Sequence, residues 1–386
     1  MTTCRHPTDH AHEHPASVSP VPLSAADWKA WGAALGPAVI ADTAVFHLTG
    51  QDLPWSKRIL TVDAGQQVTV LLSGRWYFSR AHDLWVEPGV AFHARVGAEG
   101  SMSEGPVFNP MANTGTMTAA RAGVLEIARS AGEWADDAGR LHTPQEAYVQ
   151  ADGRIDGVAI AWRGNGRGDA LEGLRALRAV MAGAGAPTAP VEAEIARLEA
   201  DPATPPGWRH FHMFGDGGIF TAPSAGEIHC HTHKNVGILQ KTVSAPLDED
   251  AVLSWRWIVD DVPAPVAEDQ LPTHDYLSIA VEFDDGQDIT YMWSSCLEVG
   301  TVFRCPLPYW CERETHVVVR SGPADLHRWL AETRRLHDDY HRHVGGTATR
   351  IVRVWLIANS VFLRRTGACR YSDIVLQGAG WREHVL

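Results

Sequence analysis

Three runs between Gly226 and Cys296 decide the fold: GEIHCHTHKNVGILQ (226–240), VLSWRWIVDD (252–261) and PTHDYLSIAVEFDDGQDITYMWSS (272–295). Each run is rich in β-branched and aromatic residues, and turn-forming residues separate the runs. Apolar and polar positions alternate along much of their length, which is typical of strands with one face in a core. We therefore predict antiparallel strands that bury one face of a sheet.

Similar runs on both sides of this stretch extend the strand pattern from residue 206 to residue 386. One segment, PADLHRWLAETRRLHDDYHRHVGG (323–346), instead has helical spacing and ends at a Gly pair. We predict a β-sandwich of the jelly-roll kind over 206–386, with one long helix at 323–346. Its remaining strand candidates lie at residues 208–223, 301–308, 315–322, 349–360 and 369–378.

The N-terminal half divides into three parts. Residues 1–24 are rich in Pro, Ser, Thr and His and predict a disordered tail. Residues 25–164 contain short strand candidates every eight to twelve residues, which favours a first antiparallel sandwich. Residues 165–205 contain two amphipathic helical segments with a break between them. The predicted fold class is mainly β, with two β-sandwich domains joined by a helical hairpin.

Composition excludes several classes of function. The chain has 33 basic and 46 acidic residues, a net charge of −13, and no basic block, so we expect no nucleic-acid partner. Six cysteines without a CxxC pair indicate reduced thiols. No run resembles a signal peptide or a membrane span, so we expect a cytoplasmic protein that does not bind membranes. Self-association is left open.

Alternating histidines on the first run suggest one kind of site. Strand alternation places His229, His231 and His233 on one face. Because residues i and i+4 of a strand lie roughly 13 Å apart, all three cannot bind one ion. His229 and His231 could hold zinc or iron, with Glu227 or Glu282 completing the site. No motif for a nucleotide or other cofactor is present, so the first expectation is a protein without cofactor.

A second interpretation needs no metal. If the ends of these strands meet at one rim, His233 or Asp275 can act as a base, with Lys234 and Tyr276 as proton partners. An alternative pairs Asp275 with Arg256 inside the core, without catalysis. The predicted catalytic residues are His233, Lys234, Asp275 and Tyr276. The predicted substrate-binding residues are Asn235, Trp255, Arg256, Trp257, His274, Glu282, Trp293 and Asn359.

This inventory suits elimination or retro-aldol cleavage, which remove one proton and deliver another without a redox cofactor. With tryptophans as walls for a flat ligand, we expect a cofactor-independent lyase acting on a small aromatic, lignin-type compound, with release of a small aldehyde such as formaldehyde. Two alternatives remain open: a metal-dependent hydrolase or isomerase that uses the histidine strand, and a carbohydrate-binding protein without catalysis.

The C-terminal part resembles a bacterial family designated DUF3047. The resemblance covers roughly residues 250–376 and implies a fold rather than an activity. At the end of the strand VWLIANS, this chain has Ala358, Asn359 and Ser360 where the family usually has an acidic run. The segments that carry the resemblance are LSWRWIVDD, ITYMWSS, VVVRSG, WLAETRRLHDDYHRH, VWLIANS and SDIVL.

The first sandwich resembles galactose-binding-like jelly rolls, including the PA-IL type of bacterial lectin. The resemblance rests on the strand rhythm of residues 64–89 and 123–140. It implies an accessory β-sandwich domain.

Overall fold

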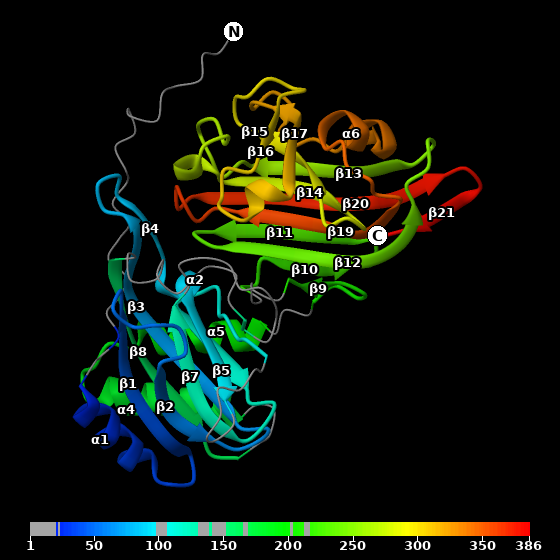
Figure 1. Cartoon of the computed structure of the whole chain (residues 1–386). Coiled ribbons are helices and arrows are strands. Elements are labelled where there is room, and N and C mark those ends of the chain that lie inside the picture. The colour runs from blue at the N-terminus through cyan, green and yellow to red at the C-terminus, as the bar shows by residue number, and fades with distance from the viewer. Residues whose placement is uncertain are drawn as a thin grey trace. The chain divides into compact units, whose positions relative to one another are not determined.

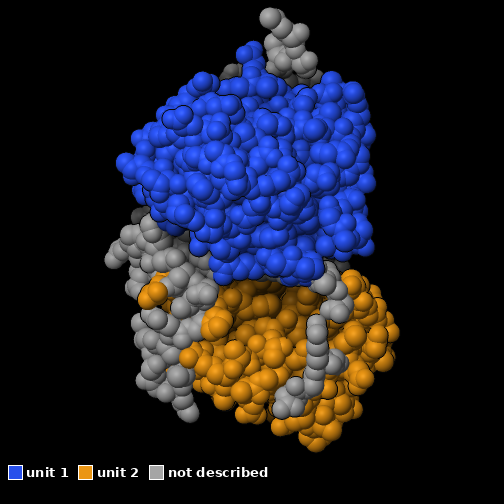
Figure 2. All heavy atoms as spheres, turned by 90° about the vertical axis from the view of Figure 1, so that its right-hand side faces the viewer, with its two compact units in different colours: residues 1–12, 203–211, 218–386 blue, residues 13–202, 212–217 orange. Residues whose placement is uncertain are grey.

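The computed structural model describes residues 21, 24–97, 106–129, 139–140, 152–164, 169–200, 204–211 and 217–386. The tail predicted over 1–24 lies almost wholly outside the described residues. The chain forms two compact units (Figure 2). The N-terminal unit comprises residues 13–202 and 212–217, and the C-terminal unit comprises 1–12, 203–211 and 218–386. Among the described residues, no helix is both long enough and apolar enough to cross a membrane.

The fold is mainly β, as predicted, with antiparallel sheets in two sandwich-like regions and a few short helices (Figure 1). The N-terminal unit has a five-stranded sheet in the order β1-β8-β3-β4, with β6 paired to β3, and a three-stranded sheet in the order β2-β7-β5. Its elements are α1 (Ala25–Leu35), β1 (Ile40–Thr49), β2 (Lys57–Val62), β3 (Gln67–Ser79), β4 (Leu84–Val86), α2 (Pro88–Ala91), β5 (Phe92–Gly97), β6 (Thr114–Thr118), β7 (Gly123–Arg129), β8 (Asp152–Trp162), α4 (Asp169–Gly183) and α5 (Ala189–Ala200).

The predicted helical hairpin is present as α4 and α5. Helix α4 buries residues at helical spacing, including Leu174, Leu177 and Met181, in the core of the N-terminal unit. Gly173 lets the helix approach Trp162 closely, because a Cβ there would lie 2.4 Å from the indole ring. By packing, the hairpin is therefore part of the N-terminal unit.

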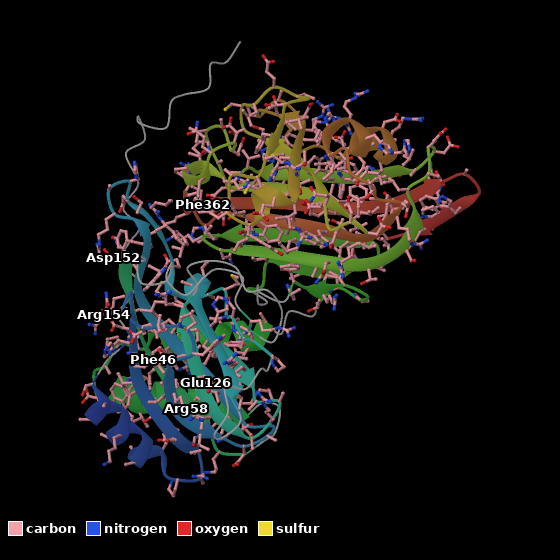
Figure 3. All side chains as sticks on the ribbon, viewed as in Figure 1. Phe46, Arg58, Glu126, Asp152, Arg154 and Phe362 are labelled. Carbon is pink, nitrogen blue, oxygen red and sulfur yellow. The ribbon has the colours of Figure 1, made fainter. Side chains whose placement is uncertain are left out.

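The small sheet of the N-terminal unit carries a buried ion pair. Glu126 of β7 accepts a hydrogen bond from Arg95 of β5 at 3.0 Å, and both side chains are 6% exposed. Arg58, on β2, lies opposite Glu126 in register (Figure 3). Because the buried carboxylate is paired, this cluster stabilises the sheet and suggests no ligand site.

The C-terminal unit contains two larger sheets. One is six-stranded, in the order β10-β11-β20-β13-β18 with β21 on β20; the other is seven-stranded, in the order β16-β17-β15-β14-β19-β12-β9. The elements are β9 (Arg209–His210), β10 (Phe220–Ser224), β11 (Glu227–His233), β12 (Val236–Pro246), β13 (Val252–Asp261), η2 (Leu271–Thr273), β14 (Tyr276–Phe283), β15 (Asp288–Ser294), β16 (Val302–Arg304), η3 (Trp310–Glu312), β17 (Glu314–Ser321), β18 (Leu330–Arg335), α6 (Leu336–His343), β19 (Arg350–Asn359), β20 (Thr366–Gly378) and β21 (Trp381–His384).

The core of this unit contains the tryptophans that we expected to wall a substrate. Trp255, Trp257 and Trp293 are 1%, 0% and 1% exposed and belong to one hydrophobic cluster. Trp255 stacks on Tyr291 at 5.8 Å, and Trp257 packs against Trp293 at 5.6 Å. The three indoles therefore fill the core, because their positions in β13 and β15 point inward. The expectation that they line a ligand site is corrected.

The long helix expected over 323–346 is also wrong. Residues 330–335 form the edge strand β18, which pairs with β13, and only Leu336–His343 are helical. Along β18, exposed residues alternate with half-buried ones, and Glu332 binds Arg320 at 2.6 Å. Pairing with β13 thus overrides the helical pattern of this sequence.

Candidate metal centre

The seven-stranded sheet carries polar side chains on the face that points away from the core. In β14, Leu277 and Ile279 belong to the core cluster, so Tyr276 and Glu282 point to the opposite face. Yet every residue of β14 and β15 is buried, which means that this polar face is covered as well. Its polar groups must therefore find partners within the protein.

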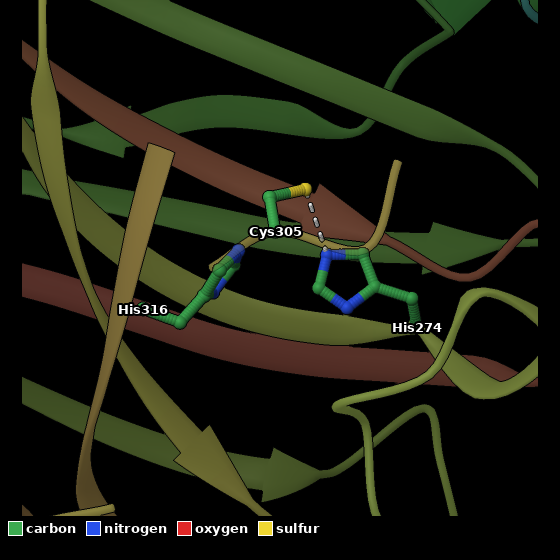
Figure 4. Close-up of side chains that lie close together, drawn as sticks. All are labelled: His274, Cys305 and His316. Atoms are coloured by element: carbon green, nitrogen blue, oxygen red, sulfur yellow. Dashed lines mark hydrogen bonds between the residues drawn. The ribbon is translucent and has the colours of Figure 1, made fainter. Parts of the chain in front are cut away.

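Three side chains of types that can bind a metal lie close together on this face: His274, Cys305 and His316 (Figure 4). His274 follows η2, Cys305 follows β16, and His316 lies in β17. The sulfur of Cys305 is 3.4 Å from Nε2 of His274, and one donor atom from each side chain lies within 4.8 Å of the others. All three residues are at most 1% exposed. Within the described residues, this is the one group of three or more His, Cys, Asp or Glu side chains that approaches so closely.

A hydrogen bond at Nδ1, the ring nitrogen that does not face Cys305, fixes the orientation of His274. Its Nδ1 lies 2.5 Å from the backbone carbonyl of Glu268. A carbonyl only accepts, so Nδ1 carries the hydrogen and Nε2 presents a lone pair toward Cys305. Burial and the neighbouring His316 lower the pKa of His274 to about 3. The ring is therefore neutral at neutral pH, the form that binds a metal.

Cys305 lies in a setting that suppresses a free thiolate. Burial and the nearby Glu314 carboxylate raise the pKa of the Cys305 thiol. Nucleophilic cysteines need the opposite, an electropositive and partly exposed site, so the 3.4 Å contact with His274 does not form an acyl-transfer dyad. A divalent cation would displace the thiol proton.

Glu314 is the fourth polar group of the cluster. Its carboxylate accepts hydrogen bonds from Thr290 at 2.9 Å and Tyr276 at 3.2 Å, and it lies 3.4 Å from Nε2 of His316. Burial raises the pKa of Glu314, but His316 and His274 close by outweigh burial and bring it to about 2. The carboxylate is therefore ionised at neutral pH although only 3% of the side chain is exposed.

Two arginines neutralise the remaining acids on this face. Arg353 donates to Glu282 at 2.7 Å, and Arg313 donates to the same carboxylate at 3.3 Å. Arg313 also lies 3.6 Å from Asp288. Glu282, expected to bind substrate or a metal, is thus held in an ion-pair network.

The histidine strand has the predicted alternation but does not form a metal site. Cys230 and Thr232 are buried, while His231 and His233 are exposed and His229 is partly exposed. His229 lies 2.9 Å from Glu227. Within the described part of the chain, the structure brings no third donor to His229 and His231.

The expected rim exists, but its side chains do not converge. Asp275 is fully buried and accepts hydrogen bonds from the backbone amides of Phe362 (3.0 Å) and Leu363 (2.7 Å). The exposed imidazole of His233 instead contacts the hydroxyl of Thr366 at 2.9 Å. The acid–base set is therefore corrected: its carboxylate holds a loop, while its imidazole faces outward.

The neighbouring predicted residues also make local contacts. Asn235 accepts hydrogen bonds from the Thr232 hydroxyl at 2.7 Å and from the His233 backbone at 2.9 Å, which forms a turn. Lys234 adopts a φ of 59° in this turn, and its backbone amide donates to the carbonyl of Arg365. These residues fix the end of β11.

Arg256 and Asn359 have separate roles. Arg256 is half exposed and lies 3.5 Å from Asp373, so the alternative pairing with Asp275 is wrong. Asn359 donates to the backbone carbonyl of His274 at 2.8 Å. Of the predicted site residues, His274, Tyr276 and Asn359 lie in or beside the cluster.

The sequence analysis missed Cys305, Glu314 and His316. Glu314 and His316 are two residues apart at the start of β17, and their spacing gives them a shared face; the strand predicted at 315–322 began one residue too late to include Glu314. Cys230, Cys305, Cys311 and Cys369 are free thiols, whereas Cys296 is disulfide-bonded, contrary to the expectation of reduced cysteines.

Residues 221–375 match the family described as "Protein of unknown function (DUF3047)". The predicted resemblance is confirmed over this DUF3047 region. The region contains all four residues of the cluster. No curated protein matches the chain.

Solved structures show only a distant likeness. The xyloglucanase domain of NopAA from Sinorhizobium fredii, in complex with cellobiose, is 9% identical, with 46% of this chain and 95% of that chain covered and a TM-score of 0.30. The family 12 xyloglucanase from Bacillus licheniformis gives 9% identity, 46% and 96% coverage and a TM-score of 0.30. A structure of carbohydrate-binding modules from the β-sandwich superfamily is 8% identical, with 87% and 98% coverage and a TM-score of 0.21. At these values, the likeness carries no statement about function.

Proposed function

We propose that the DUF3047 region binds a divalent transition metal, with His274, Cys305 and His316 as ligands. One observation carries the proposal: a thiol and two imidazoles, all buried, place donor atoms within 4.8 Å of one another. Sulfur and imidazole ligands favour zinc among the abundant divalent ions and disfavour magnesium and calcium. We thus propose a metal on the covered face of the seven-stranded sheet, and not on the histidine strand where the sequence suggested one.

The contacts made by His274 and His316 support the proposal. The hydrogen bond from His274 to the carbonyl of Glu268 is the usual way in which a ligating imidazole is oriented. Both ring nitrogens of His316 are buried and make no hydrogen bond to protein, although Nε2 lies 3.4 Å from Glu314. A metal would provide the missing partner for one of them.

Metal content tests the proposal. The full-length chain is purified without chelators, reconstituted with Zn²⁺ or Co²⁺, and analysed by inductively coupled plasma mass spectrometry. We expect stoichiometric metal in the wild type and its loss in Cys305→Ser. The matched control is Cys311→Ser, which removes an exposed free thiol six positions along the chain and should leave metal content unchanged. Wild-type protein that retains no metal after reconstitution would overturn the proposal.

The lyase activity and the carbohydrate-binding alternative, including a lectin-like role for the N-terminal unit, stay predictions. Turnover of lignin-type aromatic compounds and binding to a glycan array test them independently of the metal. The lyase prediction has lost the convergence of His233 and Asp275 on which it depended.

A further inference from the structure

We infer that Glu314 is the fourth ligand of this metal, so that the centre is saturated by protein and has a structural role. The inference rests on the proposed metal site and decides between two kinds of centre. Structural zinc sites have four protein ligands, whereas catalytic sites keep one position for water or substrate.

Two pairs of donor atoms in the cluster already have the spacing of a tetrahedral site, while the atoms of His274, Cys305 and His316 spread over up to 4.8 Å and would draw closer around an ion. For metal–ligand bonds of about 2.0–2.3 Å, the ligand atoms of a tetrahedron lie about 3.3–3.8 Å apart. Sγ of Cys305 and Nε2 of His274 are 3.4 Å apart, and Nε2 of His316 and the Glu314 carboxylate are also 3.4 Å apart. The Glu314 carboxylate also lies close enough to the Cys305 thiol for the two groups to affect each other's pKa.

Charge favours the same assignment. A divalent ion with a Cys305 thiolate, a Glu314 carboxylate and two neutral imidazoles has no net charge. With water as the ligand, a positively charged complex and the ionised Glu314 carboxylate would lie apart in a water-free interior, which favours direct contact between opposite charges. Burial therefore favours Glu314 over water as the ligand.

The surroundings of Glu314 hold it in place and keep solvent out. The hydroxyls of Thr290 and Tyr276 donate to its carboxylate, as outer-shell groups do for metal-bound carboxylates. Phe303 stacks on the His316 ring at 4.9 Å with an interplanar angle of 6°. With every donor side chain at most 3% exposed, no substrate can reach the ion in this conformation.

A metal with four protein ligands would stabilise the local structure by linking chain segments. Cys305 lies at the beginning of the connection between β16 and β17, and Glu314 lies at its end. The backbone amide of Cys305 donates to the carbonyl of Glu314 at 3.1 Å, and an ion bound to both side chains would reinforce this closure of the connection, which carries η3. His274 adds the segment that follows η2. The metal would therefore join the segment around His274 to the two ends of the connection between β16 and β17.

Exogenous anions test for the saturated centre. The full-length chain is loaded with Co²⁺, whose visible spectrum reports coordination, and titrated with azide, which displaces bound water but not a protein carboxylate. We expect no spectral change in the wild type. We expect Glu314→Gln to bind Co²⁺ at least about ten-fold more weakly and to respond to azide. Glu312→Gln, the same change at an exposed carboxylate two positions away, should behave as the wild type.

The outcomes separate this inference from the proposed function. Co²⁺ binding with an azide response in the wild type, or unchanged affinity in Glu314→Gln, would leave the metal site standing and remove Glu314 from it. Failure of the wild type to bind metal would remove both. If Glu314→Gln does not fold, an electron–nuclear double-resonance spectrum of the Co²⁺-loaded wild type in H2O and in D2O still decides the question, because it detects the exchangeable protons of a bound water whether or not azide can reach the ion.

Discussion

Asp288 and Glu314 lie opposite each other on β15 and β17, the one parallel strand pair among the described sheets. Both side chains are buried, and their pKa values move in opposite directions. Burial and the Glu314 charge raise the pKa of Asp288 well above its ordinary value, whereas the two imidazoles keep the pKa of Glu314 at about 2. The surroundings of Asp288 thus favour its protonated form, whereas those of Glu314 favour its ionised form.

This difference predicts unequal responses to amide substitution. Because burial raises the pKa of Asp288, replacing this carboxyl with a neutral amide in Asp288→Asn should change the free energy of unfolding by less than about 1 kcal/mol. Glu314→Gln removes the ionised acceptor of the Thr290 and Tyr276 hydroxyls and the negative charge beside His316, and should cost about 2–4 kcal/mol. Urea unfolding in the presence of chelator measures both values without a metal contribution. Equal costs would contradict the assigned protonation states.

The face assignment of β13 gives a second prediction. Trp257→Ala leaves a large cavity between the two sheets and should cost about 3–5 kcal/mol. Arg256→Ala, at the adjacent outward position, should cost less than about 0.5 kcal/mol. Chemical denaturation followed by circular dichroism compares the two variants. A similar cost for both would mean that the strand faces are wrongly assigned.

Strand faces could be predicted because a strand has a period of two, which the alternation of His229, Cys230 and His231 displays directly. The site could not be predicted in the same way. His274 and Cys305 are 31 residues apart and belong to no spaced motif. Their contact depends on the parallel pairing of β15 with β17 and on which loops cover the polar face. The prediction that the tryptophans line a ligand site was wrong for a related reason: a Trp in a core and a Trp in a pocket have the same sequence pattern.

Glu268 predicts a pH dependence of stability. Its side chain is 1% exposed and accepts hydrogen bonds from the Ser294 hydroxyl and the Ser295 amide. Burial dominates and raises the pKa of Glu268 to about 7, above the value of 4.5 for an unfolded chain. The folded state therefore holds the proton more tightly than the unfolded state does. Its stabilising contribution is complete below pH 4.5 and is lost as pH rises through about 7.

The matched variant Glu268→Gln isolates this contribution. Relative to Glu268→Gln, the wild type should lose up to about 3 kcal/mol of unfolding free energy between pH 5 and pH 8. Urea titrations at each pH give this difference. A difference that is constant with pH, or one that favours the wild type as pH rises, would contradict a raised pKa.

The connection between β16 and β17 gives the last prediction. If the metal binds Cys305 and Glu314, its removal leaves the ends of this connection, which contains Arg313, joined only by the pairing of β16 with β17 and by the hydrogen bond from the Cys305 amide to the Glu314 carbonyl. Arg313 is only 17% exposed while the connection is closed. Chelation should therefore raise the rate of tryptic cleavage after Arg313 by about ten-fold or more, because proteolysis follows local opening. Cleavage after Arg175, a half-exposed residue of the N-terminal unit, should not change and serves as an internal control.

Cys305→Ser should be cleaved rapidly even with added metal, while Cys311→Ser should match the wild type. Mass spectrometry of the fragments identifies the sites, and a rate at Arg313 that is indifferent to chelator would show that no metal closes this connection.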